Sequence, residues 1–166
     1  MFHTDIRRRA EVINHALASS KRMIVTAESC TGGLIAGALT DVPGSSDAVH
    51  GGFITYANEA KERMIGVPAA LLEAHGAVSE QVARAMAEGA LKVSGAAISV
   101  AVTGIAGPGG GTEGKPVGLV YFACATAETT KAGVEPYGDI GRQEVREKSI
   151  VRALDLVIEM LGIPAP

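Results

Sequence analysis

Short apolar segments alternate with amphipathic segments through the first two thirds of the chain. The apolar segments cover residues 23–27, 52–56 and 97–102. Apolar runs of this length between turn-forming residues are typical of buried strands, whereas apolar residues three and four positions apart are typical of helices. The order strand, helix, strand, helices, strand therefore predicts right-handed crossovers and a sheet with a parallel core.

The remaining segments complete the predicted fold. Helices are predicted over residues 4–21, 34–39, 59–65, 68–75, 80–94 and 142–161, with Asn58 and Ser79 as caps of two of them. A strand over 117–126 and a short edge strand over 134–137 follow each other without a long helix, which favours antiparallel pairing. We therefore expect an α/β fold. It is a three-layer α/β/α sandwich around a mixed, mostly parallel sheet of about five strands, forming a single domain over residues 1–166.

The composition narrows the class of protein further. Apolar residues make up 47% of the 166 positions and charged residues 20%, which excludes disorder as the default state. A formal net charge of −3 gives no electrostatic footprint for nucleic acid. No segment approaches the roughly 18 apolar residues of a membrane-spanning helix, and the first residues lack the apolar region of a signal peptide. We expect a soluble, cytoplasmic protein that binds neither nucleic acid nor a membrane.

The sequence offers no pattern of metal ligands. Cys30 and Cys124 are the only cysteines and lie far apart, without zinc-ligand spacing to one another or to a histidine. The four histidines are scattered, and no HExxH motif occurs. We therefore predict no metal site and two reduced thiols.

The glycine-rich loop over residues 104–114 contains two misleading motifs. Gly109, Gly111 and Gly114 satisfy the pattern GxGxxG, and residues 109–115 match the first part of a P-loop. Both motifs require a helix after the loop, because the phosphate binds at the helix N-terminus. Here the loop is followed by a predicted strand, so neither type of nucleotide site is expected. The loop either lets a ligand approach the backbone closely or is a flexible connection without a ligand.

Polar residues follow each of the first three predicted strands, at the edge where open α/β sheets bind ligands. These clusters cover residues 26–33, 55–61 and 103–108. Ser29, Cys30 and Thr31 precede a helix, whose first amides can hold a phosphate or stabilise an oxyanion. The alternative is that these residues only cap the helix. Cys30 as nucleophile is a weaker alternative, because no histidine pattern accompanies it.

Lys61 and Arg142 are the candidate basic residues of this site. Lys61 falls in the first turn of a predicted helix, where the helix dipole and any desolvation lower the pKa of an ammonium. A lysine that is neutral in this way can serve as the general base for a hydroxyl nucleophile. Arg142 and Arg146 begin the last helix and are placed to meet an anionic ligand. The alternative for all three is an ordinary solvated side chain.

At these residues the sequence resembles the C-terminal domain family of competence/damage-inducible protein CinA, whose stand-alone, PncC-like members are nicotinamide mononucleotide deamidases. The resemblance rests on segments that cover most of the chain in order. They are Ala-Glu-Ser-Cys-Thr-Gly-Gly at 27–33, Pro-Gly-Ser-Ser at 43–46, and the segments at 52–61, 65–67, 75–80, 103–108 and 115–118. The molybdopterin-binding-like domain of the longer members is absent, so the chain is expected to be a free-standing form.

The resemblance implies a specific reaction. The carboxamide of nicotinamide mononucleotide would be hydrolysed to nicotinate mononucleotide and ammonia, in pyridine nucleotide recycling. Ser29 would be the nucleophile and Lys61 its base, with Tyr56 as a third catalytic residue. The implied substrate-binding residues are Cys30, Thr31, Gly32, Ser46, Thr103, Gly104 and Arg142. The family uses no metal or organic cofactor and tends to self-associate, so we expect a homo-oligomer. The alternative function is a non-catalytic nucleotide-binding or regulatory module that retains the pocket.

Overall fold

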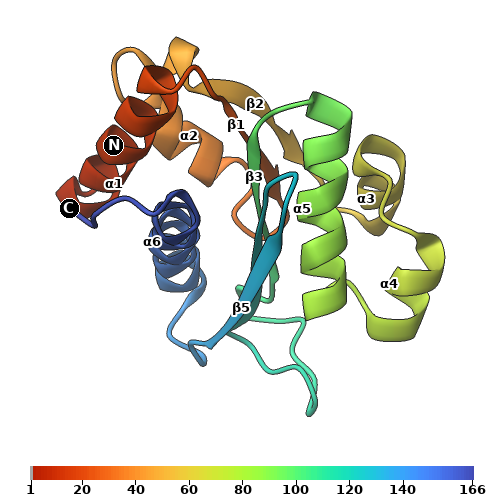
Figure 1. Ribbon diagram of the computed structural model, residues 1–166. Helices are drawn as coiled ribbons and strands as arrows, with labels where there is room; N and C mark the ends of the chain where they lie inside the picture. The colour runs from red at the N-terminus through yellow and green to blue at the C-terminus, as the bar shows by residue number, and fades with distance from the viewer. Residues whose placement is uncertain (1) are drawn as a thin grey trace.

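A five-stranded mixed sheet forms the centre of the protein (Figure 1). The computed structural model describes residues 2–166. The strands are β1 (Ile24–Glu28), β2 (Val49–Ile54), β3 (Ile98–Gly104), β4 (Leu119–Ala125) and β5 (Thr130–Pro136), in the spatial order β2-β1-β3-β4-β5. β1 pairs in parallel with both β2 and β3, whereas β4 and β5 are antiparallel additions. The predicted mixed sheet with a parallel core is confirmed.

Helices cover both faces of this sheet. On one face lie α1 (Thr4–Ser19), α2 (Leu34–Thr40) and α6 (Arg142–Leu161), as Figure 1 shows. On the other lie α3 (Asn58–Ile65), α4 (Ala69–His75) and α5 (Glu80–Ser94), and a short 3-10 turn, η1 (Ser45–Asp47), precedes β2. The three-layer α/β/α architecture is therefore also confirmed. None of the helices within residues 2–166 is long and apolar enough to span a membrane.

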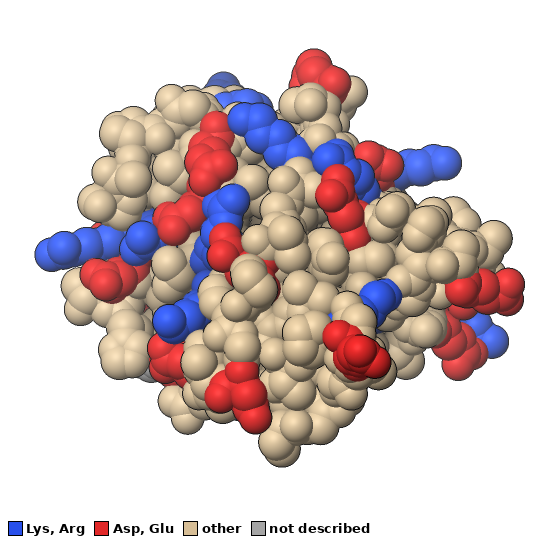
Figure 2. Space-filling model, turned by 90° about the horizontal axis from the view of Figure 1, so that it is seen from below, with Lys and Arg blue, Asp and Glu red and all other residues tan. Residues whose placement is uncertain are grey.

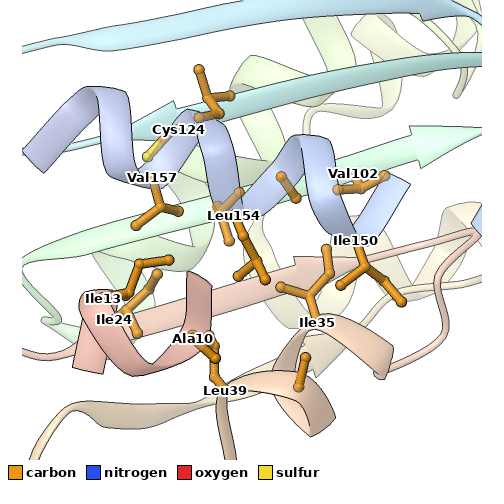
Figure 3. Packing of buried hydrophobic residues seen from close by; sticks show 14 of the residues in the cluster. Ala10, Ile13, Ile24, Ile35, Leu39, Val102, Cys124, Ile150, Leu154 and Val157 are labelled. Atoms are coloured by element: carbon orange, nitrogen blue, oxygen red, sulfur yellow. The ribbon is translucent and has the colours of Figure 1, made fainter. Parts of the chain in front are cut away.

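The alternation of side chains along the strands divides the core into two unequal layers. On β3, Val100 and Val102 face α1, α2 and α6, together with Ile98, whereas Ala101 faces α5. The first layer consists mainly of the branched side chains of isoleucine, leucine and valine, and Figure 3 shows a part of it. The second layer is rich in alanine, so α5 can approach the sheet closely. Burial of each large side chain contributes about 1.5–3 kcal/mol, so these two layers stabilise the whole frame.

Several predicted boundaries shift in the structure. The edge strand predicted over 134–137 is β5, which begins at Thr130 and pairs with β4 along its full length. Its glycine and alanine residues carry no strand signal, and only pairing with β4 defines the strand. Asn58 is the first residue of α3 rather than its cap, which is Ala57, whereas Ser79 caps α5 as predicted and accepts a hydrogen bond from the Val82 amide.

The carboxyl ends of β1, β2 and β3 meet at one edge of the sheet because the three strands are parallel. The Ser29 amide donates to the Val102 carbonyl, and the Thr55 amide donates to the Glu28 carbonyl. The glycine-rich loop between β3 and β4 lies at the same end of the molecule, at the bottom of Figure 1. Acidic and basic side chains are interspersed on the face seen from this end (Figure 2). The three predicted polar clusters are thus neighbours in space.

Candidate active site

The turn between β1 and α2 presents Ser29 at this edge. Gly32 and Gly33 have φ values of 60° and 98°, in the left-handed region that favours glycine. A Cβ atom on Gly33 would also lie 3.0 Å from Ile54 Cδ1. Two glycines at this point therefore let the chain leave the strand and enter α2 within a few residues, with Ser29 at the start of the turn.

Glu28 stabilises this turn through hydrogen bonds to its backbone. Its carboxylate is fully buried and accepts hydrogen bonds from the amides of Gly33, Ile35 and Ala36 at 3.1, 3.0 and 2.8 Å. The Thr26 hydroxyl donates to the same carboxylate at 3.0 Å. A carboxylate at a helix N-terminus satisfies amides that have no partner within the helix and interacts favourably with the helix dipole. The prediction that the opening amides of α2 are free for a ligand is therefore wrong for these three.

Lys61 reaches the Ser29 hydroxyl from α3. Its Nζ lies 3.2 Å from Ser29 Oγ, and the side chain is only 1% exposed. The same Nζ donates to the backbone carbonyls of Thr55 at 2.8 Å and Tyr56 at 3.2 Å. The structure therefore brings the predicted nucleophile and the predicted base within hydrogen-bond distance of each other, although they are 32 positions apart in the sequence.

Burial shifts the pKa values of Lys61 and of the neighbouring Cys30. Desolvation lowers the pKa of Lys61 to about 8, because the charged ammonium loses its hydration. About a tenth of the amine is therefore neutral at pH 7, compared with far less for an ordinary lysine. The Cys30 thiol is also buried, and desolvation raises its pKa to about 11. Cys30 is therefore a neutral thiol under the same conditions, which disfavours it as the nucleophile.

Seven of the predicted site residues line one crevice of about 260 Å³. They are Ser29, Cys30, Tyr56, Lys61, Thr103, Gly104 and Arg142. Gly109 and Gly110 close the crevice from the glycine-rich loop, which is followed by β4 and not by a helix, as predicted.

Arg142 connects opposite sides of the crevice. It donates to the Tyr56 hydroxyl at 3.2 Å and to the Gly107 carbonyl at 3.0 Å. Tyr56 is 59% exposed, so its ring lies at the mouth of the crevice. The Thr103 hydroxyl is already engaged, since it donates to the Ala77 carbonyl at 2.8 Å. Among residues 2–166, Arg142 and Lys61 are the basic side chains that line the crevice, and no carboxylate lines it with them.

Three predicted residues do not line the crevice. Thr31 is fully buried behind the turn, and Gly32 is exposed beside it. Ser46 is exposed in η1, which precedes β2 and therefore lies at the amino ends of the parallel strands. Because the crevice is at the carboxyl ends, the sheet separates Ser46 from Ser29 within one chain.

Three contributors to the site are absent from the predicted site residues. Glu28 gives a usable signal, because an acidic residue just before a glycine-rich helix start is a candidate for binding the helix amides. Ala77 and Val78, from the connection between α4 and α5, also line the crevice, and their signal in the sequence is the family motif at residues 75–80. Within residues 2–166, no group of three His, Cys, Asp or Glu side chains is arranged to hold a metal ion.

Fold and crevice together define a three-layer α/β/α domain with a buried serine–lysine pair at the carboxyl edge of its sheet. A family model described as "CinA C-terminal domain" matches residues 6–161, so the chain belongs to the CinA C-terminal domain family.

Curated relatives and solved structures agree with this membership. The chain is 51% identical over 148 residues to a CinA-like protein of Anaeromyxobacter sp. (strain K), covering 89% of this chain but 36% of that protein. It is 48% identical over 167 residues to a CinA-like protein of Mycolicibacterium paratuberculosis, covering 97% and 38%. The chain thus spans less than two fifths of these relatives.

Two solved structures match the chain over nearly its whole length. The competence/damage inducible protein CihA from Agrobacterium tumefaciens is 49% identical, with a TM-score of 0.95 and 98% of each chain covered. A competence-damaged protein (CinA) superfamily protein from Escherichia coli is 32% identical, with a TM-score of 0.90 and 96% and 93% covered. The arrangement of helices and strands described above is therefore the fold of this family.

Proposed function

We propose that this protein hydrolyses the carboxamide of nicotinamide mononucleotide to nicotinate mononucleotide and ammonia, with Ser29 as nucleophile and Lys61 as general base. The observation that carries the proposal is the buried contact of 3.2 Å between Lys61 Nζ and Ser29 Oγ. The substrate follows from the resemblance of the sequence motifs to the deamidases. The crevice supports this substrate because Arg142 offers a positive charge for a phosphate, and because several glycine and alanine residues in its lining leave room for a flat ring.

The contacts of Lys61 suit a general base. A neutral amine has two N–H groups and one lone pair. Lys61 has two carbonyl acceptors, on Thr55 and Tyr56, and its third neighbour is the Ser29 hydroxyl. When the two N–H groups donate to the carbonyls, the lone pair is left for the proton of Ser29. The two carbonyls thus orient the amine for proton abstraction.

The proposed reaction proceeds through an acyl-enzyme. Lys61 Nζ takes the proton of Ser29 Oγ as that oxygen attacks the carboxamide carbon. The resulting ammonium then protonates the amide nitrogen, the C–N bond breaks, and ammonia leaves. A water molecule, deprotonated by the same amine, attacks the ester on Ser29, and the proton returns to Ser29 Oγ. Lys61 ends the cycle in its initial state, so all protons balance.

A backbone amide beside the nucleophile is available for the oxyanion of the tetrahedral intermediate. Glu28 occupies the amides of Gly33, Ile35 and Ala36. Cys30 lines the crevice, and within the described part of the chain its amide donates to no protein acceptor. A hydrogen bond from such a donor strengthens as charge develops on the attacked oxygen. Arg142 at the mouth of the crevice is placed to bind the phosphate of the substrate.

The test is product formation from nicotinamide mononucleotide, with no added metal, by the wild type and by Lys61→Met and Lys92→Met. Lys92 is an exposed lysine on α5 and serves as the matched control. Loss of a general base typically costs about 10²- to 10⁴-fold in rate. We expect that loss for Lys61→Met and an unchanged rate for Lys92→Met, with both variants folded by circular dichroism.

The same experiment separates the enzyme from the alternative, a nucleotide-binding or regulatory module. Saturable binding of nicotinamide mononucleotide by the wild type without release of ammonia supports the module and contradicts the enzyme. A normal rate in folded Lys61→Met contradicts the proposed base.

A further inference from the structure

Arg146 contacts the turn that carries the nucleophile, although it does not line the crevice. From α6, its Nε donates to the Cys30 carbonyl and its Nη2 to the Thr31 carbonyl, both at 3.1 Å. These two carbonyls belong to the second and third residues of the turn that begins at Ser29. Arg142, one helical turn earlier on α6, lines the crevice, whereas Arg146 does not. The neighbouring Val145 and Ser149 are fully buried and hold this part of α6 in place.

The turn is therefore held on two sides by opposite charges. The Glu28 carboxylate binds amides at its helix end. The Arg146 guanidinium binds carbonyls in its middle. A guanidinium presents its donors in a fixed plane, so two simultaneous hydrogen bonds determine the orientation of both peptide groups.

The orientation of these peptides also fixes the start of the turn, where Ser29 lies. In a trans peptide the N–H points away from the C=O. Arg146 holds the Thr31 carbonyl, and the N–H of the same peptide, on Gly32, donates to the Ser29 carbonyl at 3.1 Å. The positive charge of Arg146 beside the carbonyl also polarises this peptide and strengthens its N–H as a donor. Arg146 is therefore connected to the backbone of the nucleophile through one peptide group.

We propose that Arg146 is a positioning residue that fixes the peptide groups after Ser29, and with them the position of the nucleophile. This inference rests on the proposed amide hydrolysis. The alternative is that Arg146 only anchors α6 to the turn, as a contribution to stability. The two roles differ in what they change: positioning affects kcat, whereas anchoring affects the unfolding free energy alone.

The test compares Arg146→Met with Arg152→Met. Arg152 lies further along α6, is similarly half-buried, and forms ion pairs with Glu135 and Glu159, away from the crevice. A displacement of about 1 Å at a reacting group costs up to about 10²-fold in rate. For Arg146→Met we expect kcat for nicotinamide mononucleotide to fall about 10- to 100-fold, with KM within about twofold of the wild type. Arg152→Met should keep the wild-type kcat, and Arg146→Lys, which retains the charge and one donor, should recover part of it.

A second measurement does not depend on the substrate. A small sulfonyl fluoride should label Ser29 in the wild type, and the labelling rate reports on the nucleophile and its base alone. We expect slower labelling in Arg146→Met and the wild-type rate in Arg152→Met. If the wild type is labelled but does not hydrolyse nicotinamide mononucleotide, the proposed substrate is wrong, and the labelling rates alone decide the role of Arg146.

Three results would overturn the inference. They are unchanged kcat and labelling in Arg146→Met, an equal loss in Arg152→Met, and a wild type that is not labelled at Ser29 at all. If Arg146→Met does not fold, Arg146→Lys decides the question, because a lysine that restores folding but only part of kcat and of the labelling rate supports positioning by the guanidinium. Full kcat and labelling in Arg146→Lys would contradict it.

Discussion

Because the amine of Lys61 is buried, we expect the unfolding free energy of the protein to depend on pH by an amount that can be calculated. Desolvation lowers the pKa of Lys61 from 10.5 to about 8 in the folded protein. In the unfolded chain the amine keeps its ordinary value. Between about pH 8 and 10.5 the unfolded state therefore binds more protons, and the folded state becomes more stable as the pH rises. Below pH 8 both states carry the charge, and the folded state carries the full desolvation cost.

The size of the effect follows from the same shift. Each pKa unit corresponds to about 1.4 kcal/mol, so the lowered pKa of Lys61 corresponds to about 3 kcal/mol. The methionine in Lys61→Met cannot titrate. Between pH 7 and 10.5, we expect the wild type to gain about 3 kcal/mol in unfolding free energy relative to this variant. The difference in unfolding free energy between the two chains does not contain the contributions of other groups that titrate at high pH, such as the Cys124 thiol, because both chains contain these groups.

The assay is urea denaturation of both chains at a series of pH values over this range. Lys92→Met, which replaces an exposed lysine, should show no such dependence relative to the wild type. A constant difference in unfolding free energy between the wild type and Lys61→Met would refute the argument, because it would mean that burial does not shift the pKa of Lys61.

Three further predictions concern the site and its frame. The rate constant kcat/KM for nicotinamide mononucleotide should rise about tenfold per pH unit below pH 8 and level off above it, because only the neutral amine of Lys61 is a base. A flat pH profile of kcat/KM from pH 6 to 9 would contradict this prediction. Glu28→Ala leaves three amides without an acceptor and should lower the unfolding free energy, measured by urea denaturation, by at least about 3 kcal/mol. Glu28→Gln should lower it by less. An unchanged denaturation midpoint would show that the carboxylate does not stabilise α2. Gly89→Ala would place a Cβ 1.9 Å from the Ile65 carbonyl oxygen and should lower the unfolding free energy by at least about 2 kcal/mol. Gly37→Ala, whose Cβ would lie 3.5 Å from the nearest atom, should not. Equal thermal midpoints for these two variants would refute the close approach of α5 to α3.

The fold could be predicted well where apolar runs were bounded by turn-forming residues. The run over 97–102 gave β3, and the succession of strands and helices gave the parallel pairing of β1 with β2 and β3. β5 could not be delimited, because Ala132 and Gly133 carry no strand signal and the strand exists through its hydrogen bonds to β4. Local propensity and tertiary pairing are separate sources of structure, and only the first is visible in the sequence.

The candidate site was predictable to the extent that it depends on topology. Parallel strands place their carboxyl ends together, and this rule brought Ser29, Lys61 and Thr103 into one crevice. The role of Glu28 was not predicted, because it depends on a side chain folding back over the following turn. The position of Ser46, at the other edge of the sheet, depends on where the connection between α2 and β2 crosses.

The most direct test of the central claim is the covalent state of Ser29 during turnover. The protein would be mixed with nicotinamide mononucleotide, quenched with acid in the steady state, digested, and examined by mass spectrometry. We predict that the peptide containing Ser29 carries the nicotinate mononucleotide acyl group and that this adduct is absent from Ser29→Ala, which should release no ammonia. An adduct on Cys30 instead, or ammonia release at the wild-type rate by folded Ser29→Ala, would contradict the account.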